Sequence, residues 1–160
     1  MNNILKNISI TIIFIMSLIS SSQASEAFSH SVLTLLDDPR NEKPWTLILN
    51  NQQDWEDFYN KPLAYMTFPQ GEAPVAPKID FERYQVLTGG LGVKNTGGFQ
   101  LVVNNVRELD NELLVHVLVV RPSANCLTIQ QVSYPSTTIL VEKNNKPFKF
   151  VVSQLIDECL

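Results

Sequence analysis

The sequence predicts a mainly β fold of the α+β class, either a single small antiparallel β-sandwich or a curled sheet, with one packed helix. Three observations lead to this prediction. Runs of alternating or β-branched residues succeed one another in the second half of the chain, separated by turns too short for helical crossovers. A single segment near residue 55 spaces its aromatic residues as a helix does. The 160 residues, 44% hydrophobic and 18% charged, suffice for one domain with a core and do not describe a disordered chain.

Residues 1–24 are predicted to be a cleaved signal peptide. The apolar run "ISITIIFIMSLIS" (Ile8–Ser20) has the length of a signal h-region and falls short of the roughly 20 residues that a membrane span needs. Ser22 and Ala24 supply small residues at positions −3 and −1 of a cleavage site after Ala24. The alternative is an uncleaved N-terminal anchor. We therefore expect a periplasmic or secreted protein with no transmembrane anchor after cleavage. We also expect no lipid anchor, since no cysteine stands directly after the cleavage site.

Residues 25–43 are expected to be irregular, apart from "SVLTLL", which fits a strand or a helical turn. The predicted β domain covers residues 44–160 and opens with the strand "PWTLILN". A helix follows, capped by Asn50 or Asn51 and stopped by Pro62. Its aromatic residues are spaced by three and four and share one face, which we expect to pack on a sheet rather than bind a ligand: Trp55, Phe58 and Tyr59.

A proline-rich loop at residues 68–80 separates this helix from the remaining predicted strands. The predicted strand segments are residues 81–93, 99–109, 111–122, 127–135, 136–143 and 146–152. Their short connections favour antiparallel pairing throughout.

The stretch "GVKNTGGF" (Gly92–Phe99) is the one candidate recognition motif. It lacks the Lys-Ser/Thr ending of a phosphate-binding P-loop and the third glycine of a dinucleotide fingerprint, and a strand follows it rather than a helix. Asn95, Gly97 and Gly98 can adopt positive φ at little cost. The stretch is therefore either a strained hairpin turn or a rigid loop that offers backbone donors and Phe99 to a partner.

Composition and spacing argue against several functions. The formal charge of −4 and scattered basic residues argue against nucleic-acid binding. His30 and His116 lack metal-ligand spacing and no G-x-S-x-G elbow exists, so we expect no enzyme activity, no metal and no cofactor. His116, in mid-strand, is expected to be a hydrogen-bonded structural residue. Cys126 and Cys159 are predicted to form a disulfide, the alternative being two free thiols.

The segment "IDFERYQVLTGGLGVKNTGGFQLVVNNV" followed by "LLVHVLVVRPSANCLTIQQVSYPSTTILVEK" resembles the C-terminal domain family named for the protease complex subunit PrcB. The resemblance covers residues 80–143, and more loosely residues 45–152. It lies in Asp80-Phe81, in a turn of the type T-G-G-aromatic ending at Phe99, in Pro122, and in the approach to Pro135. The turn is its most specific part.

The resemblance implies an exported, non-catalytic accessory protein of a cell-envelope or secreted protease. The founding members are lipoproteins, and this chain departs from them because it has no lipobox cysteine. We expect the partner to be another exported protein and to contact the glycine loop and one nearby arginine: Lys94, Asn95, Thr96, Gly97, Gly98, Phe99 and Arg121.

A second resemblance keeps a different function open. "NTGGF" is similar to the N-P-T-T-G-aromatic loop of chagasin-like inhibitors of cysteine proteases, and Arg121-Pro122-Ser123 echoes their R-P-W loop. Here Ser123 stands in place of the tryptophan, and Arg121 comes only one hairpin after the glycine loop. A small protease inhibitor and a structural envelope protein without a protease partner are therefore the alternative functions.

Overall fold

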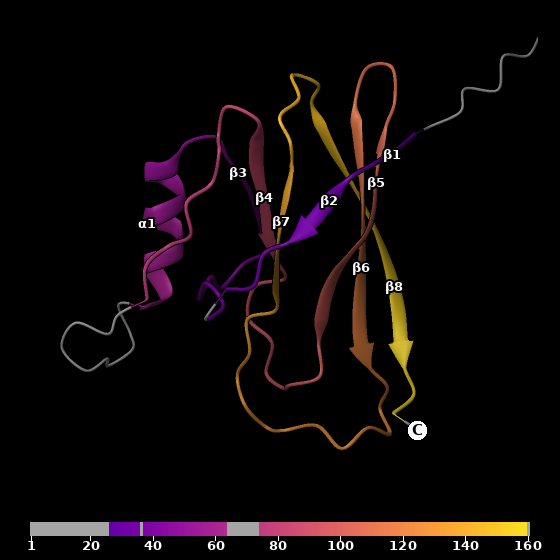
Figure 1. Cartoon of the computed structure of the whole chain (residues 1–160). Coiled ribbons are helices and arrows are strands. Elements are labelled where there is room, and N and C mark those ends of the chain that lie inside the picture. Colours follow the sequence, from indigo (N-terminus) through magenta and orange to yellow (C-terminus); the bar gives the residue numbers. More distant parts are fainter. Residues whose placement is uncertain (1–25, 36, 64–73, 160) are drawn as a thin grey trace, which may run out of the picture.

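Two four-stranded sheets face each other, and one helix covers the outer face of the second sheet (Figure 1). The computed structural model describes residues 26–35, 37–63 and 74–159. The elements in chain order are β1 (Glu26–Phe28), β2 (His30–Val32), β3 (Trp45–Leu49), α1 (Gln52–Leu63), β4 (Tyr84–Gly90), β5 (Gln100–Glu108), β6 (Leu113–Pro122), β7 (Ser136–Glu142) and β8 (Phe148–Asp157). The predicted mainly β sandwich with one packed helix is confirmed.

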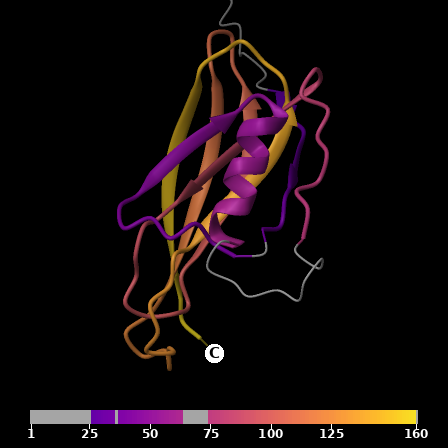
Figure 2. The same ribbon diagram turned by 90° about the vertical axis from the view of Figure 1, so that its left-hand side faces the viewer.

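The two sheets join at one side and are open at the other. The first sheet has the order β1-β5-β6-β8, and the second has the order β2-β7-β4-β3. β1 and β2 are consecutive parts of one short segment that passes from the first sheet to the second (Figure 1). The opposite edge strands, β3 and β8, lie on the same side of the sandwich (Figure 2).

The main core fills the space between the sheets. Alternate residues of β6 are buried, as expected for a strand with one face on the core. The buried residues of this core come from β4, β5, β6 and β7: Leu87, Val103, Val106, Leu113, Val115, Val117, Ile139 and Val141. Each fully buried aliphatic side chain contributes about 1.5–3 kcal/mol relative to an exposed one.

The helix forms a second core on the outer face of the second sheet. Asn51 caps it, because its Oδ1 accepts the Asp54 N–H at 2.9 Å. Trp55, Phe58 and Tyr59 are all buried there, and the Trp55 indole donates to the Pro77 carbonyl at 2.9 Å. The prediction that the aromatic face of the helix packs on a sheet is confirmed.

One predicted strand is wrong. Residues 127–135 form a loop whose only ladder contact is an isolated bridge between Ser133 and Lys94. They cannot pair with β6, the strand that precedes them, because β5 and β8 occupy both of its sides. Pro135 also lacks the N–H that a strand interior needs. The segment predicted as a short strand therefore remains outside the sheets.

The direction of strand pairing also differs from the prediction that all strands pair antiparallel. β8 runs parallel to β6, because the chain leaves β6, passes through β7 in the other sheet, and returns before β8 begins. Gly92–Phe99 is not a hairpin turn, since β4 and β5 belong to different sheets.

The segment 25–43, expected to be irregular, supplies β1 and β2 from its described residues, because β5 and β7 each have a free edge there. The predicted signal peptide, residues 1–24, lies outside the described residues.

Candidate functional site

Two loops at one end of the sandwich cross between the sheets and lie against each other (Figure 1). One comprises residues 91–99, between β4 and β5, and the other comprises residues 123–135, between β6 and β7. We call their combined surface the two-loop surface. It contains the glycine-rich motif that the sequence singles out.

Backbone hydrogen bonds hold the two loops together. Lys94 and Ser133 exchange reciprocal N–H to carbonyl bonds of 2.8 and 2.9 Å. Gly97 N–H donates to the Ile129 carbonyl at 2.9 Å, and the Ser133 hydroxyl donates to the Thr96 carbonyl at 2.9 Å. Because both loops use backbone groups, their relative position depends little on side-chain rotamers.

Two glycines are required by the path of the first loop. Gly92 has a φ of +71°, and a Cβ placed there would lie 2.6 Å from the Glu42 carbonyl oxygen. Gly98 has a φ of +88° and packs on Pro122. Of the three residues that can adopt positive φ at little cost, Gly98 does so, whereas Asn95 and Gly97 do not.

The second loop is tied to the end of β8. Cys126 and Cys159 form the predicted disulfide, with a Cα–Cα distance of 5.6 Å. Ser123 N–H donates to the Asp157 carbonyl at 2.9 Å beside it. At the far end of the loop, Leu91 N–H donates to the Pro135 carbonyl at 2.9 Å. The loop is therefore fixed at both ends and along its length.

This well-anchored loop exposes large apolar side chains. Leu127 is fully exposed, Ile129 is 72% exposed and Val132 is 52% exposed. Clustered apolar side chains on a surface are typical of protein interaction sites. These residues lie in a predicted strand, although the prolines on either side of the stretch, Pro122 and Pro135, are typical of a loop.

The residues predicted to contact a partner lie at this end of the molecule. In the glycine loop, Asn95 and Gly98 are exposed, whereas Thr96 and Gly97 are half-buried. The Lys94 ammonium lies 5.7 Å from the centre of the half-buried Phe99 ring. Arg121 is exposed at the end of β6, next to the Pro122 that contacts Gly98.

A polar cleft of about 650 Å³ adjoins the two-loop surface. Its walls combine Asp37, Asp38 and Arg40 with residues 97, 129 and 131–134. Burial raises the pKa of Asp38, and the hydrogen bond that the Ser136 hydroxyl donates to Asp38 Oδ1 partly offsets this rise. The cleft offers charged groups of both signs beside an apolar patch, a combination suited to protein recognition.

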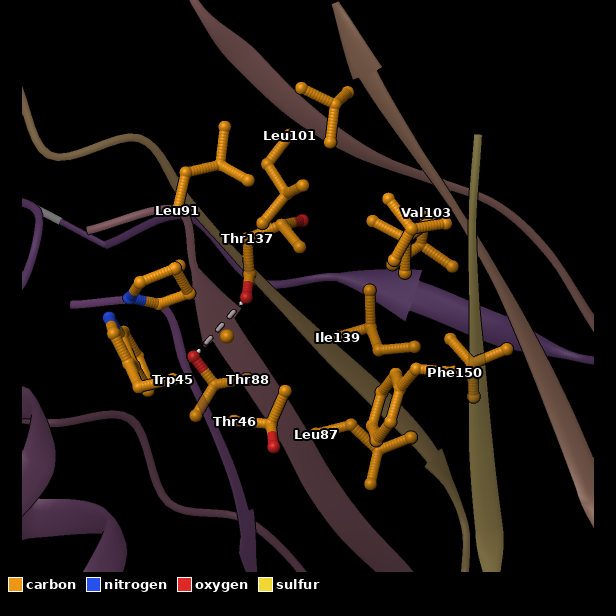
Figure 3. Close-up of a pocket in the computed structure, with 17 residues that line it drawn as sticks. Trp45, Thr46, Leu87, Thr88, Leu91, Leu101, Val103, Thr137, Ile139 and Phe150 are labelled. Carbon is orange, nitrogen blue, oxygen red and sulfur yellow. Dashed lines mark hydrogen bonds between the residues drawn. The ribbon is translucent and has the colours of Figure 1, made fainter. Parts of the chain in front are cut away.

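A separate apolar cavity of about 300 Å³ lies between the sheets, on the side where β3 and β8 form the edges. Figure 3 shows Leu101, Val103 and Phe150 of the first sheet opposite Leu87 and Ile139 of the second. The Thr88 hydroxyl donates to the Thr137 carbonyl at 3.2 Å (Figure 3). Val152 lines the cavity from β8, so the cavity reaches the open side of the sandwich.

The two histidines have structural positions. His30 lies in β2, and His116 lies in β6, where its Nε2 is 2.8 Å from an Arg107 guanidinium nitrogen. Within residues 26–35, 37–63 and 74–159, no group of three or more His, Cys, Asp or Glu side chains is placed to hold a metal ion. In the same ranges no helix has the length and apolar character needed to cross a membrane.

Comparison with known proteins gives one match. Residues 86–142 match the family model described as PrcB C-terminal, a span from β4 to the end of β7 that includes both loops of the two-loop surface. None of the curated proteins and none of the solved structures matches the chain. The resemblance inferred from the T-G-G-aromatic turn is confirmed, because residues 86–142 are similar to the PrcB C-terminal family model.

Proposed function

We propose that this protein is an exported, non-catalytic subunit or partner of a cell-envelope or secreted protease, and that it binds the protease through the two-loop surface. The observation that carries the proposal is the exposed apolar group Leu127, Ile129 and Val132 on a loop that a disulfide and backbone hydrogen bonds hold in place. The family supports the class of partner, because it is named for a protease complex subunit.

A preorganised loop is suited to binding another protein. Ordering a flexible segment on association costs free energy, and a loop already held by the Lys94–Ser133 bridge avoids much of that cost. The exposed apolar residues would supply buried contact area, and Arg121 and the cleft around Asp38 would supply polar contacts at the rim.

The chemistry of the two-loop surface supports a non-catalytic role. The two-loop surface contains Ser133 but no histidine, since His30 and His116 both lie within strands of the described structure. A nucleophilic serine needs a general base within hydrogen-bond reach. Cys126, the cysteine of the second loop, is bonded to Cys159 in the disulfide and so is no free nucleophile. We therefore assign binding rather than turnover to this end of the molecule.

The proposal is tested by affinity capture of the tagged protein from its own cell-envelope and secreted fractions, with mass spectrometry of the proteins that co-elute. We expect a protease near one-to-one stoichiometry. The same capture with the double variant Lys94→Glu and Thr96→Arg should lose it, whereas Lys78→Glu, an exposed change outside both loops, should retain it. Recovery of wall material without any protease would contradict the proposal and support a structural envelope role.

The inhibitor alternative is separated from the accessory role by titration. The glycine loop and Arg121 lie at the same end of the sandwich, because Gly98 packs on Pro122, the residue after Arg121. Adding the purified protein to the captured protease should leave its activity measurable at saturation if the protein is an accessory subunit. Stoichiometric loss of activity would instead assign inhibition to the same surface.

A further inference from the structure

β8 is an unusually exposed edge strand. Among the described strands its one neighbour is β6, and every residue from Val151 to Cys159 is exposed. Large apolar side chains on both of its faces are among them, with Val152 61%, Leu155 50% and Ile156 45% exposed. The ten residues contain no proline or glycine and only two charges, Lys149 and Asp157. Edge strands that must stay unpaired usually carry charges, proline or bulges, and β8 has almost none of these protections.

The sequence of β8 is complementary to itself in one antiparallel register. When Ser153 faces Ser153 of a second copy, Lys149 faces Asp157 of that copy, and the reverse contact occurs at the other end. Between these charge pairs, Phe150 faces Ile156 and Val151 faces Leu155. Cross-strand pairs of opposite charge and of apolar side chains are the units that stabilise a sheet.

Neighbouring registers lose this match. A shift by two residues places Asp157 opposite either Pro147 or Val151, so neither charge finds its counterpart. Registers shifted by two are the relevant competitors, because they keep the same side chains on each face of the sheet. The register centred on Ser153 is therefore preferred by both charge and apolar contacts.

The side-chain directions agree with this arrangement. In the ladder with β6, Lys149 is level with Leu114 and Asp157 is level with Pro122, so both charges lie on the outer face of the first sheet. Phe150 and Val152 lie on the inner face and line the cavity. A two-fold axis perpendicular to the sheet keeps inner residues opposite inner residues, and it brings the open sides of both sandwiches toward each other.

We propose that β8 is a self-association edge: two copies of this chain pair antiparallel through β8, about a two-fold axis at Ser153, and form a continuous eight-stranded sheet. The contact is isologous, as closed dimers require. It uses no residue of the two-loop surface named above as a protease contact, so it stands or fails independently of the proposed function.

Sedimentation velocity of the purified protein over a range of micromolar concentrations tests the proposal. We expect a concentration-dependent dimer. Lys149→Glu or Asp157→Lys alone should weaken dimerisation about tenfold, because each replaces two attractive contacts with two repulsive ones. The double variant, with the charges exchanged, should return to within about threefold of the wild type. Within one copy these residues stand eight positions apart on one strand, so only an intermolecular contact explains such a rescue.

Two further variants keep the test independent of folding effects. Lys149 also lies 3.6 Å from Glu112 in the same copy, and Glu112→Gln should leave dimerisation unchanged. Leu155→Lys alters a side chain that is half exposed in the single copy, and it should give a folded monomer with an unchanged circular dichroism spectrum. A wild type that stays monomeric at all concentrations, or a double variant no better than the single variants, would overturn the proposal.

Discussion

At the residue scale, two glycines of the same loop have different structural requirements. Gly92 combines a φ of +71° with backbone atoms of Glu42 and Lys43 within 2.7 Å of where a Cβ would lie. Gly97 has an ordinary φ, and the atoms nearest to its Cβ position, those of Ile129, are 3.8 Å away. The first glycine is needed by the backbone itself, and the second is not.

Gly92→Ala is therefore expected to lower the free energy of unfolding by about 2–3 kcal/mol, from backbone strain and a clash that no side chain can relieve. Gly97→Ala is the matched control and should change stability by less than about 0.5 kcal/mol. Urea unfolding followed by circular dichroism measures both. Equal effects of the two substitutions would contradict the assignment of strain to Gly92.

Asp38 makes stability depend on pH in a specific direction. Burial raises its pKa above the usual value of about 4, so the folded state binds its proton more tightly than the unfolded state. The stability that this group contributes is present below about pH 4 and is lost as pH rises through the folded-state pKa. Asp38→Asn should therefore gain stability relative to the wild type between pH 3 and pH 7, measured as the difference between urea unfolding curves. A difference that does not change with pH would contradict this role.

At the scale of elements, the two-loop surface combines a fixed backbone with exposed apolar side chains. Leu127 and Ile129 are exposed, whereas the backbone carbonyl of Ile129 accepts the bond from Gly97. Binding and loop geometry can thus be separated by changing side chains alone.

Leu127→Lys and Ile129→Lys are expected to weaken protease binding about tenfold or more while leaving the unfolding free energy within about 0.5 kcal/mol of the wild type. Calorimetric titration with the captured protease measures the first quantity, and urea unfolding measures the second. Val75→Lys, which changes an equally exposed apolar residue outside both loops, is the control and should bind normally. Unaltered affinity in both loop variants would remove these residues from the interface.

At the scale of the whole molecule, the disulfide connects the end of β8 to the loop that follows β6. The bridge closes a segment with a sequence separation of 33, for which chain entropy predicts a contribution of about 3–4 kcal/mol. The double variant Cys126→Ser and Cys159→Ser should lose about this much unfolding free energy in urea. The reduced wild type should match it. A loss below about 1 kcal/mol would show that the β6–β8 ladder alone holds this end of the chain.

The sequence anticipated the features that depend on local patterns. The helical spacing of Trp55, Phe58 and Tyr59 predicted the packed face, and the cysteine pair predicted the disulfide. It did not anticipate features that depend on which edges are free. Residues 127–135 were predicted as a strand but pair with the glycine loop through an isolated bridge instead of joining a sheet. β8 pairs in parallel with β6 because the chain passes through the other sheet first. Because these residues were expected in a strand, the exposed apolar side chains Leu127, Ile129 and Val132 were not predicted from sequence to be part of the candidate site.

Amide hydrogen exchange of the protein, alone and with the captured protease, tests the central claim most directly, because it locates the contact on the chain. The account predicts that exchange slows on binding at residues 94–99 and 127–133. It also predicts that the helix Gln52–Leu63, on the far side of the second sheet, is unaffected. Protection confined to the helix or to other surfaces, with both loops exchanging at their original rates, would contradict the claim that the two-loop surface binds the partner.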